Sequence, residues 1–224
     1  MSAGTAVPAP ALGSAHRHFV LRWILFVTLG ESTGFALAAA VAIGATAADL
    51  PDPVRYVLLI AGGAVEGILL GSSQVLAVPR PRPMGAAWVL ATGAAAAIAW
   101  AIGMLPSLLS LDITQPLVAV LVPVGAVLIL GSIPTAQWVA LRRPLTARWI
   151  PVNMGAWAIA IVWTFAPSPI VDETTPIAVT VVLYVAAGLL MAATVAALTA
   201  HTAAMIFGTP KQTHRLTPAA SQEK

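Results

Sequence analysis

Charged residues are scarce in this sequence, and their scarcity excludes a soluble fold. Only 8% of the 224 residues are Asp, Glu, Lys or Arg, whereas 59% are hydrophobic. An ordinary soluble domain carries about 25% charged residues. Because this chain cannot cover itself with a polar surface, we expect it to be embedded in a membrane.

Cysteine is absent altogether, which excludes disulfides, thiolate metal sites and cysteine nucleophiles. The sequence also lacks an Asp-rich motif that could hold Mg²⁺ against a diphosphate, a histidine cluster and a glycine-rich nucleotide loop. We therefore expect neither a metal nor another cofactor.

Long apolar runs dominate what is present. A membrane-spanning helix needs about 20 mostly apolar residues. Six runs qualify, at residues 19–47, 54–78, 86–105, 117–141, 147–166 and 176–207. The sequence thus predicts an all-α, polytopic membrane protein, a bundle of six transmembrane helices. Residues 19–207 would form this domain, and the Pro/Ala-rich segment 1–18 and the tail 208–224 would be disordered.

The charges between these runs alternate in sign. The basic residues gather at both termini and in two of the loops: Arg17, Arg22, Arg80, Arg82, Arg142, Arg143, Arg148, Lys211, Arg215 and Lys224. The other three loops carry Asp49, Asp52, Asp112, Asp172 and Glu173, with Arg55 as their one cation. Cytoplasmic loops are enriched in Lys and Arg, so we expect a multi-pass protein of the cell membrane with both termini in the cytoplasm. Topology explains the pI of about 10.0, and we expect no nucleic-acid partner.

Short segments of the chain resemble one another. "QVLAVPRP" (74–81) and "QWVALRRP" (137–144) share a Gln followed by Arg-Pro, and "GILLGSS" (67–73) is similar to "GLLMAAT" (188–194). Three of the apolar runs also begin near a Trp. These similarities predict three repeated helical hairpins of about 60 residues, which could build one central site. The alternative is that membrane helices drawn from few residue types simply look alike.

Two glutamates lie inside the apolar runs. Glu66 shares one helical face with Gly63, Ser73 and Gln74, and Glu31 lies in "TLGESTGF" on the preceding run. Each is about twelve residues from the start of its run, so at 1.5 Å per residue both reach the middle of the bilayer. We expect the two antiparallel helices to bring the carboxyls together.

A carboxyl at this depth favours a functional role because ionisable groups inside a membrane are costly. Two carboxylates that share a site do not ionise together easily, so one keeps its proton and can donate it. No Lys or Arg lies at mid-span to pair with Glu66, and we expect a neutral Glu66 at pH 7. The alternative is a neutral side chain that only bonds neighbouring helices together.

Aromatic and amide side chains complete the candidate site. Trp100, Trp157 and Trp163 lie deep in their runs or toward the acidic loops, and they would either anchor the protein in lipid or line a pocket. An aromatic face stabilises a cation through its quadrupole. Gln74 and Asn153 would either contact a ligand or join helices. Four further residues, Trp23, Trp88, Trp138 and Trp149, lie near the basic ends of their runs, where an interfacial aromatic belt is expected.

The segments "GESTGF", "GAVEGILLGSSQ" and "AWAIGMLPS", together with the deep tryptophans, resemble membrane-bound terpene cyclases. The likeness extends over residues 19–207 and is to the small bacterial kind that cyclises indole-linked sesquiterpenes in drimentine-type pathways. It implies metal-independent protonation of an alkene or epoxide, cyclisation of the cation and deprotonation. Glu66 or Glu31 would donate the proton to a hydrophobic, farnesyl-indole type isoprenoid drawn from the membrane lipid. A prenyltransferase of the same pathway would supply that substrate.

Two other functions stay open at the level of sequence. Midplane carboxyls and internal repeats also suit a proton-coupled small-molecule transporter. Glycine-rich helices that pack closely suit a membrane scaffold without chemistry of its own.

Overall fold

The computed structural model describes residues 12–80, 82–112, 114–141, 146–172 and 174–208. They form only helices and the turns that join them. The elements in chain order are α1 (Leu12–Ala47), α2 (Asp52–Ala77), α3 (Ala86–Leu108), α4 (Pro116–Leu141), α5 (Trp149–Ala160), the 3₁₀ helix η2 (Ile161–Phe165) and α6 (Ile177–Phe207).

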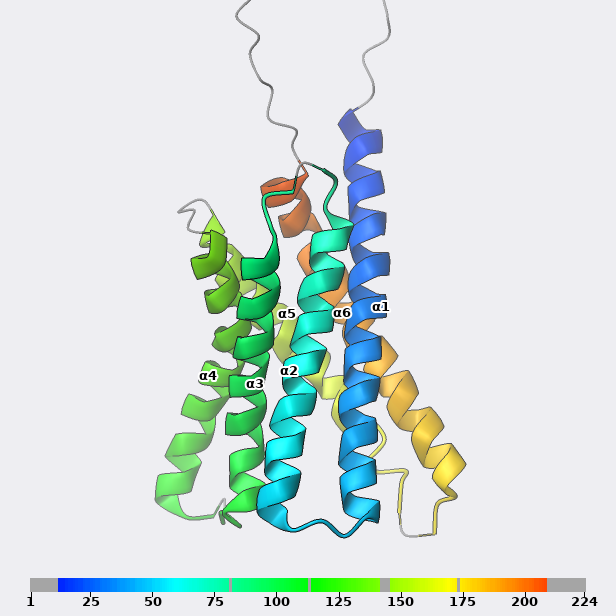
Figure 1. The fold of residues 1–224 in the computed structure, drawn as a ribbon, viewed down its shortest axis with the longest axis vertical. Helices are drawn as coiled ribbons and strands as arrows, with labels where there is room; N and C mark the ends of the chain where they lie inside the picture. Colours follow the sequence, from blue (N-terminus) through cyan, green and yellow to red (C-terminus); the bar gives the residue numbers. More distant parts are fainter. Residues whose placement is uncertain (1–11, 81, 113, 142–145, 173, 209–224) are drawn as a thin grey trace, which may run out of the picture.

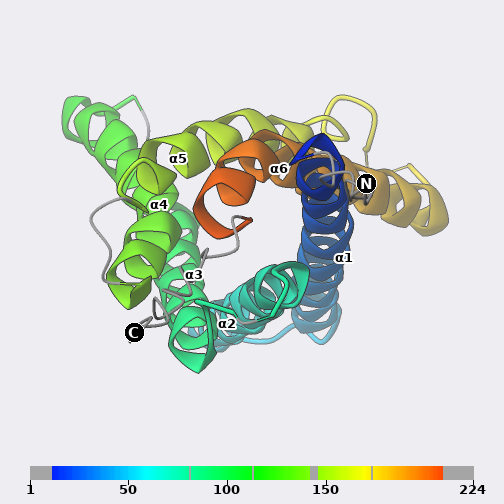
Figure 2. The same cartoon turned by 90° about the horizontal axis from the view of Figure 1, so that it is seen from above.

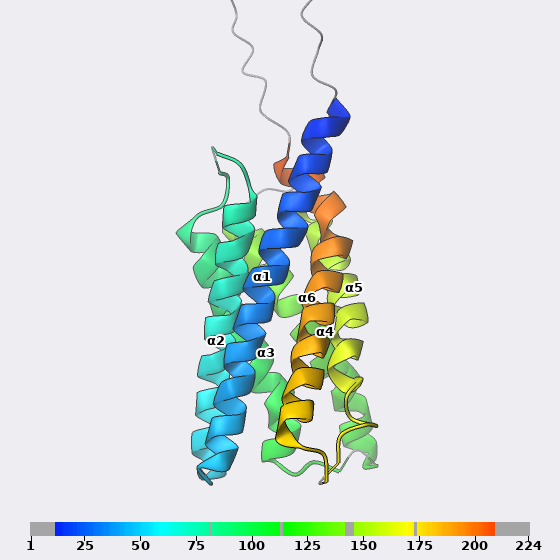
Figure 3. The same cartoon turned by 90° about the vertical axis from the view of Figure 1, so that its right-hand side faces the viewer.

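The helices stand side by side and form a ring (Figures 1 and 2). Each helix packs against its neighbours in sequence, and α6 closes the ring against α1. The α1–α2, α3–α4 and α5–α6 connections lie at one end, and the start of α1 and the end of α6 lie toward the other, as Figures 1 and 3 show. We call the first end the acidic end, after Asp49, Asp112 and Asp172, and the second the arginine-rich end, after Arg22 and Arg82.

Five helices, α1, α2, α3, α4 and α6, are long and apolar enough to cross a membrane. Their outward faces carry exposed apolar side chains such as Leu25 and Val182, which suit contact with lipid. The sixth predicted span, 147–166, coincides with a shorter apolar helix, Trp149–Phe165, of which the last turn is η2. A helical membrane bundle is therefore supported, whereas the count of six spans stays a prediction.

The helix α1 begins before the predicted boundary. Residues 12–18 are helical rather than disordered. No proline follows Pro10 in this part of the chain, and Leu, Ala and Arg are good helix formers, so the helix extends beyond the apolar run. The rest of the predicted N-terminal disorder, 1–11, and residues 209–224 of the predicted tail lie outside the described residues.

Each connection at the acidic end places a proline four residues after an aspartate. The three pairs are Asp49–Pro53, Asp112–Pro116 and Asp172–Pro176. Each proline lies at the start of α2, α4 or α6, where its missing N–H leaves no helical bond unmade. This recurrence went unnoticed in the sequence.

A buried aromatic cluster fills the ring at the arginine-rich end. It consists of Phe19, Trp23, Trp88, Trp149 and Phe207. The indoles of Trp23, Trp88 and Trp149 are at most 1% exposed, and the centroids of Trp23 and Trp149 lie 5.9 Å apart, edge to face. The prediction that these three tryptophans form an interfacial belt is wrong, because they point toward one another across the ring rather than toward lipid.

Each of these three tryptophans donates its indole N–H to a polar side chain on the helix that comes before its own helix around the ring. Trp88 donates to Gln74 Oε1 and Trp149 donates to Gln137 Oε1, each at 2.8 Å. Trp23 donates to Thr199 Oγ1 at 3.1 Å. These bonds join α2 to α3, α4 to α5 and α6 to α1.

The amide of Gln137 connects two of these bonds. Its Nε2 donates to Gln74 Oε1 at 2.9 Å and to Thr92 Oγ1 at 3.0 Å. One side chain thus links α2, α3, α4 and α5. Since the bundle interior offers no bulk water, such a bond is hard to replace once it is lost.

We expect the Gln137→Met variant to be less stable than the wild type by about 1–3 kcal/mol, because Trp149 Nε1 would be left buried without its acceptor. Thermal unfolding of the detergent-solubilised protein measures this. The matched control is Thr194→Val, which removes the acceptor of the more exposed Trp163 N–H. Equal melting temperatures for the two variants would contradict a structural role for the Gln137 network.

Candidate functional site

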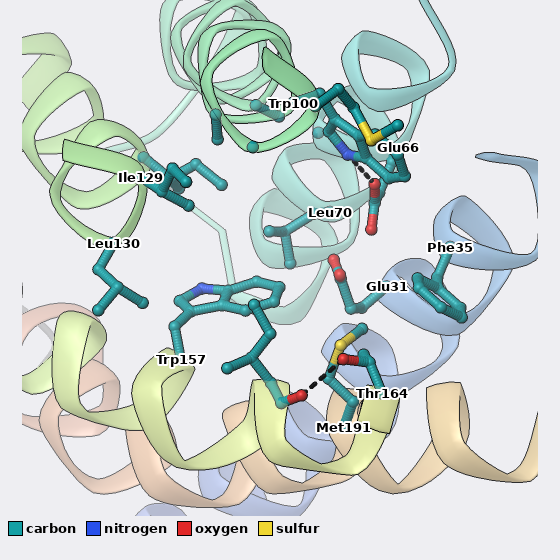
Figure 4. A pocket seen from close by; sticks show the side chains of 17 residues that line it. Glu31, Phe35, Glu66, Leu70, Trp100, Ile129, Leu130, Trp157, Thr164 and Met191 are labelled. Atoms are coloured by element: carbon teal, nitrogen blue, oxygen red, sulfur yellow. Dashed lines mark hydrogen bonds between the residues drawn. The ribbon is translucent and has the colours of Figure 1, made fainter. Parts of the chain in front are cut away.

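A pocket of about 340 Å³ lies inside the ring next to the aromatic cluster, toward the acidic end. Helices α1 to α6 and η2 all contribute to its wall. Its polar side chains are Glu31, Glu66 and Thr164; apolar and aromatic side chains make most of the remainder (Figure 4). We call it the carboxyl pocket. The structure thus brings together the two glutamates that the sequence singled out.

Glu31 extends from α1 into this pocket and is fully buried. Among the described residues no N–H or hydroxyl group donates a hydrogen bond to either of its carboxyl oxygens. Its carboxyl group points toward that of Glu66 (Figure 4). A buried carboxyl without such a donor is costly to keep, so its presence needs an explanation beyond packing.

Glu66 extends from α2 and is 8% exposed. In contrast to Glu31 it has a firm partner, since Trp100 Nε1 donates to Glu66 Oε2 at 2.7 Å. No such donor reaches Glu31 among the described residues. The two acids are therefore chemically different, although they face one another.

Two glycines allow this arrangement. A Cβ at Gly34 would lie 2.8 Å from the Cα of Glu66, so α1 and α2 meet closely only because Gly34 has no side chain. The ring of Trp100 occupies the space that a Cβ of Gly63 would need. Gly63 thus sets the position of the indole that holds Glu66.

Aromatic rings form much of the remaining wall. Trp157 projects from α5 into the pocket beside Glu31, and Phe35 lies one turn further along α1 (Figure 4). Trp100 and Trp157 were both predicted to line a pocket, and both do. Phe35, Leu70 and Met191 also line it, and sequence reasoning missed them because single apolar residues carry no signal of their own.

The other three predicted binding residues lie elsewhere. Trp163 is 39% exposed on η2, and its N–H donates to Thr194 Oγ1 at 3.1 Å. Gln74 lies in the polar network that joins the helices. Asn153 is buried about one helical turn from Trp157, and its Oδ1 has no partner among the described residues. None of the three lines the carboxyl pocket.

A shared register places the lining residues on α1, α3 and α5. Glu31, Ala96 and Trp157 all line the pocket, and each follows Trp23, Trp88 or Trp149 of the aromatic cluster by about two helical turns. One turn later Phe35, Trp100 and Ile161 also line it. The signal that would have located the pocket was thus the spacing from the three buried tryptophans.

The helices α2, α4 and α6 share a register of their own. Glu66, Ile129 and Met191 line the pocket. About two turns further on lie Gln74, Gln137 and Thr199, which accept the indole N–H bonds. Of the three positions Glu66, Ile129 and Met191, only the first is an acid. The spacing therefore recurs on three helices, whereas the acid is on α2 alone.

The aspartates at the acidic end stabilise turns. Thr114 donates its backbone N–H and its hydroxyl to Asp112 Oδ1, and these bonds lower the pKa of Asp112. Thr174 and Thr175 lower the pKa of Asp172 in the same way. Among the described residues no group of three His, Cys, Asp or Glu side chains could hold a metal ion.

Comparison with models of protein families, with curated proteins and with solved structures found no match for this chain. The function is therefore argued from the geometry of the site.

The Gly34→Ala variant should disturb the carboxyl pocket, because its new methyl group would press on the backbone of α2 at Glu66. We expect a lower melting temperature in detergent and a smaller thermal stabilisation by any ligand of the pocket. Gly44→Ala on the same helix is the control, since a Cβ there meets nothing within 4 Å. If Gly34→Ala behaved like Gly44→Ala, the close contact of α1 and α2 would not position Glu66.

Proposed function

We propose that this protein is a membrane terpene cyclase, an enzyme that protonates and cyclises a membrane-dissolved isoprenoid of the farnesyl-indole type without a metal. The observation that carries the proposal is the pair of buried carboxyls, Glu31 and Glu66, which face one another in an apolar, aromatic-walled pocket. A proton held by this pair can pass from one carboxyl to the other or to a ligand that enters the pocket. An apolar wall selects an apolar ligand.

The two carboxyls take different roles in this mechanism. Glu31 is the acid, because it has no N–H donor that would stabilise its negative charge. Glu66 is the base, because the N–H of Trp100 stabilises its negative charge. The expectation that Glu66 is neutral at rest stays a prediction; the mechanism proposed here places the resting proton on Glu31 instead.

The reaction balances within the pocket. The proton of Glu31 adds to the less substituted carbon of the terminal double bond, or to the oxygen of an epoxide, and leaves a tertiary carbocation. A second double bond of the chain attacks this centre and closes a ring. Glu66 then removes a proton from a carbon next to the new cation, which restores a double bond. Transfer of that proton from Glu66 to Glu31 resets the pair, so no external acid is consumed.

The aromatic walls support the cationic stage. The faces of Trp157, Trp100 and Phe35 are available to a positive charge in the chain. The apolar lining also keeps water away, which would otherwise capture the cation as an alcohol. The same lining disfavours the transport of a hydrophilic molecule.

We propose further that the ring is built of three helical hairpins, α1–α2, α3–α4 and α5–α6, with six spans and both termini in the cytoplasm. Equivalent positions recur about 60 residues apart in the tryptophans, in the indole acceptors and in the Asp-Pro turns. The arginine-rich end would face the cytoplasm of the cell membrane. The substrate would enter from membrane lipid after a prenyltransferase has made it.

The proposal is tested with membranes that contain the protein and with farnesylated indole as substrate. We expect cyclic isomers in the wild type, detected by chromatography with mass spectrometry. Glu31→Gln should lower their rate of formation by about 10²–10⁴-fold, because a general acid contributes that much. Asp112→Asn makes the same chemical change outside the pocket and should keep full activity. Full activity of Glu31→Gln, or flux of a solute driven by a pH gradient and lost in that variant, would overturn the proposal.

Infrared spectroscopy of the resting protein tests the assignment of the two acids. We expect a protonated-carboxyl band at pH 7 that disappears in Glu31→Gln and persists in Glu66→Gln. Loss of the band in Glu66→Gln alone would reverse the two roles.

A further inference from the structure

A second pocket of about 420 Å³ lies at the acidic end between α1, α2 and α3. Its lining is more polar than that of the carboxyl pocket and includes Thr46, Tyr56 and Ser107, with Asp52 and Arg55 at its edge. We call it the polar pocket. The proposed reaction makes no use of it.

The two pockets are neighbours. Met104 on α3 lines both of them. Its unbranched thioether side chain can change conformation at little cost and can therefore open or narrow a passage between the two spaces. Tyr56 lies about 15 Å from Glu66 along α2. One elongated molecule could therefore occupy both pockets, with one end beside the glutamates and the other near the membrane surface.

The polar pocket has one positive and one negative side chain, Arg55 and Asp52, among its described lining residues. Arg55 forms a salt bridge with Asp52, so the described lining has no unpaired cation to hold a phosphate or a carboxylate. A diphosphate would meet the charge of Asp52 as well. These two charges favour an uncharged group over an anion in this pocket.

The hydroxyls of the pocket define this group more closely. Tyr56 donates its proton to the carbonyl of Ala101 at 3.0 Å, and Thr46 donates its proton to the carbonyl of Ala42 at 3.0 Å. Each hydroxyl has one proton, so in this arrangement both oxygens can only accept a further bond. A ligand group that bonds to the oxygens of Tyr56 and Thr46 must donate an N–H or an O–H.

We infer that the polar pocket is a second binding site, for the uncharged, hydrogen-bond-donating head group of the ligand whose apolar chain fills the carboxyl pocket. The inference rests on the proposed function for the nature of the chain. It adds that the head group binds between α1, α2 and α3, and that an isoprenyl diphosphate is not bound.

The experiment uses chains that cannot react. Saturated farnesyl chains are attached to indole, to N-methylindole or to diphosphate, and their affinities are measured by the ligand-induced rise in melting temperature. We expect the wild type to bind the indole compound about three- to tenfold more tightly than the N-methyl compound, which is the effect of one hydrogen bond. The diphosphate should give no shift.

Variants then locate the head group. Tyr56→Phe and Thr46→Val remove the two acceptors, and at least one of them should abolish the preference for N–H over N-methyl while both compounds still bind. Met104→Trp should weaken the binding of both by filling the passage. Met205→Trp places the same bulk on the exposed face of α6 and should not.

Each result is decisive. Equal affinity for the indole and N-methyl compounds, a preference that survives both hydroxyl variants, or binding of the diphosphate overturns the second site and leaves the cyclase proposal intact. Failure of every saturated chain to bind overturns both. Because the chains are unreactive, none of these outcomes depends on catalysis.

Discussion

Polar side chains inside a membrane have no water to bond, and this constraint shapes the whole molecule. Within single helices, hydroxyl groups form their hydrogen bonds with backbone carbonyls one turn earlier, as those of Thr33 and Thr199 do. Between helices, indole N–H groups donate hydrogen bonds to Gln74, Gln137 and Thr199. These bonds join neighbouring helices. The indoles that donate them fill the interior of the bundle at the arginine-rich end.

Several buried polar atoms have no such bond among the described residues, on Thr28, Glu31, Trp138 and Asn153. Of these four residues Glu31 is the one that lines the carboxyl pocket. Its neighbour Glu66 has a donor in Trp100, and Trp100 is held in place over Gly63. In the proposed mechanism this contrast makes the two acids unequal, with Glu31 as the acid and Glu66 as the base. Two equivalent carboxyls would only compete for one proton, whereas two unequal ones can act in sequence.

The pocket-lining positions recur at the same spacing on alternate helices, and this recurrence explains how a site with one pair of acids fits into a regular bundle. The lining positions of α2 recur on α4, and that of Glu66 recurs on α6 as well, so that Ile129 and Met191 lie where α2 has Glu66. The apolar replacements provide the wall that a hydrophobic ligand needs. Aromatic packing at the arginine-rich end closes the ring on that side, so the carboxyl pocket and the polar pocket both lie toward the acidic end.

The sequence by itself determined the helices, because apolar runs of membrane length leave few alternatives to an α-helix. It also determined the common depth of Glu31 and Glu66, since rise per residue converts position in a run directly into depth. It did not determine which way a side chain faces around the ring. Trp23, Trp88 and Trp149 look like belt residues by position, yet they are buried because their N–H groups find acceptors on the neighbouring helices. Gln74 and Asn153 were as polar as any ligand-binding residue, and packing placed them outside the carboxyl pocket. Only the tertiary structure decided that Trp100 would bond Glu66 and not Glu31, because that choice depends on contacts between helices that are distant in sequence and close in space.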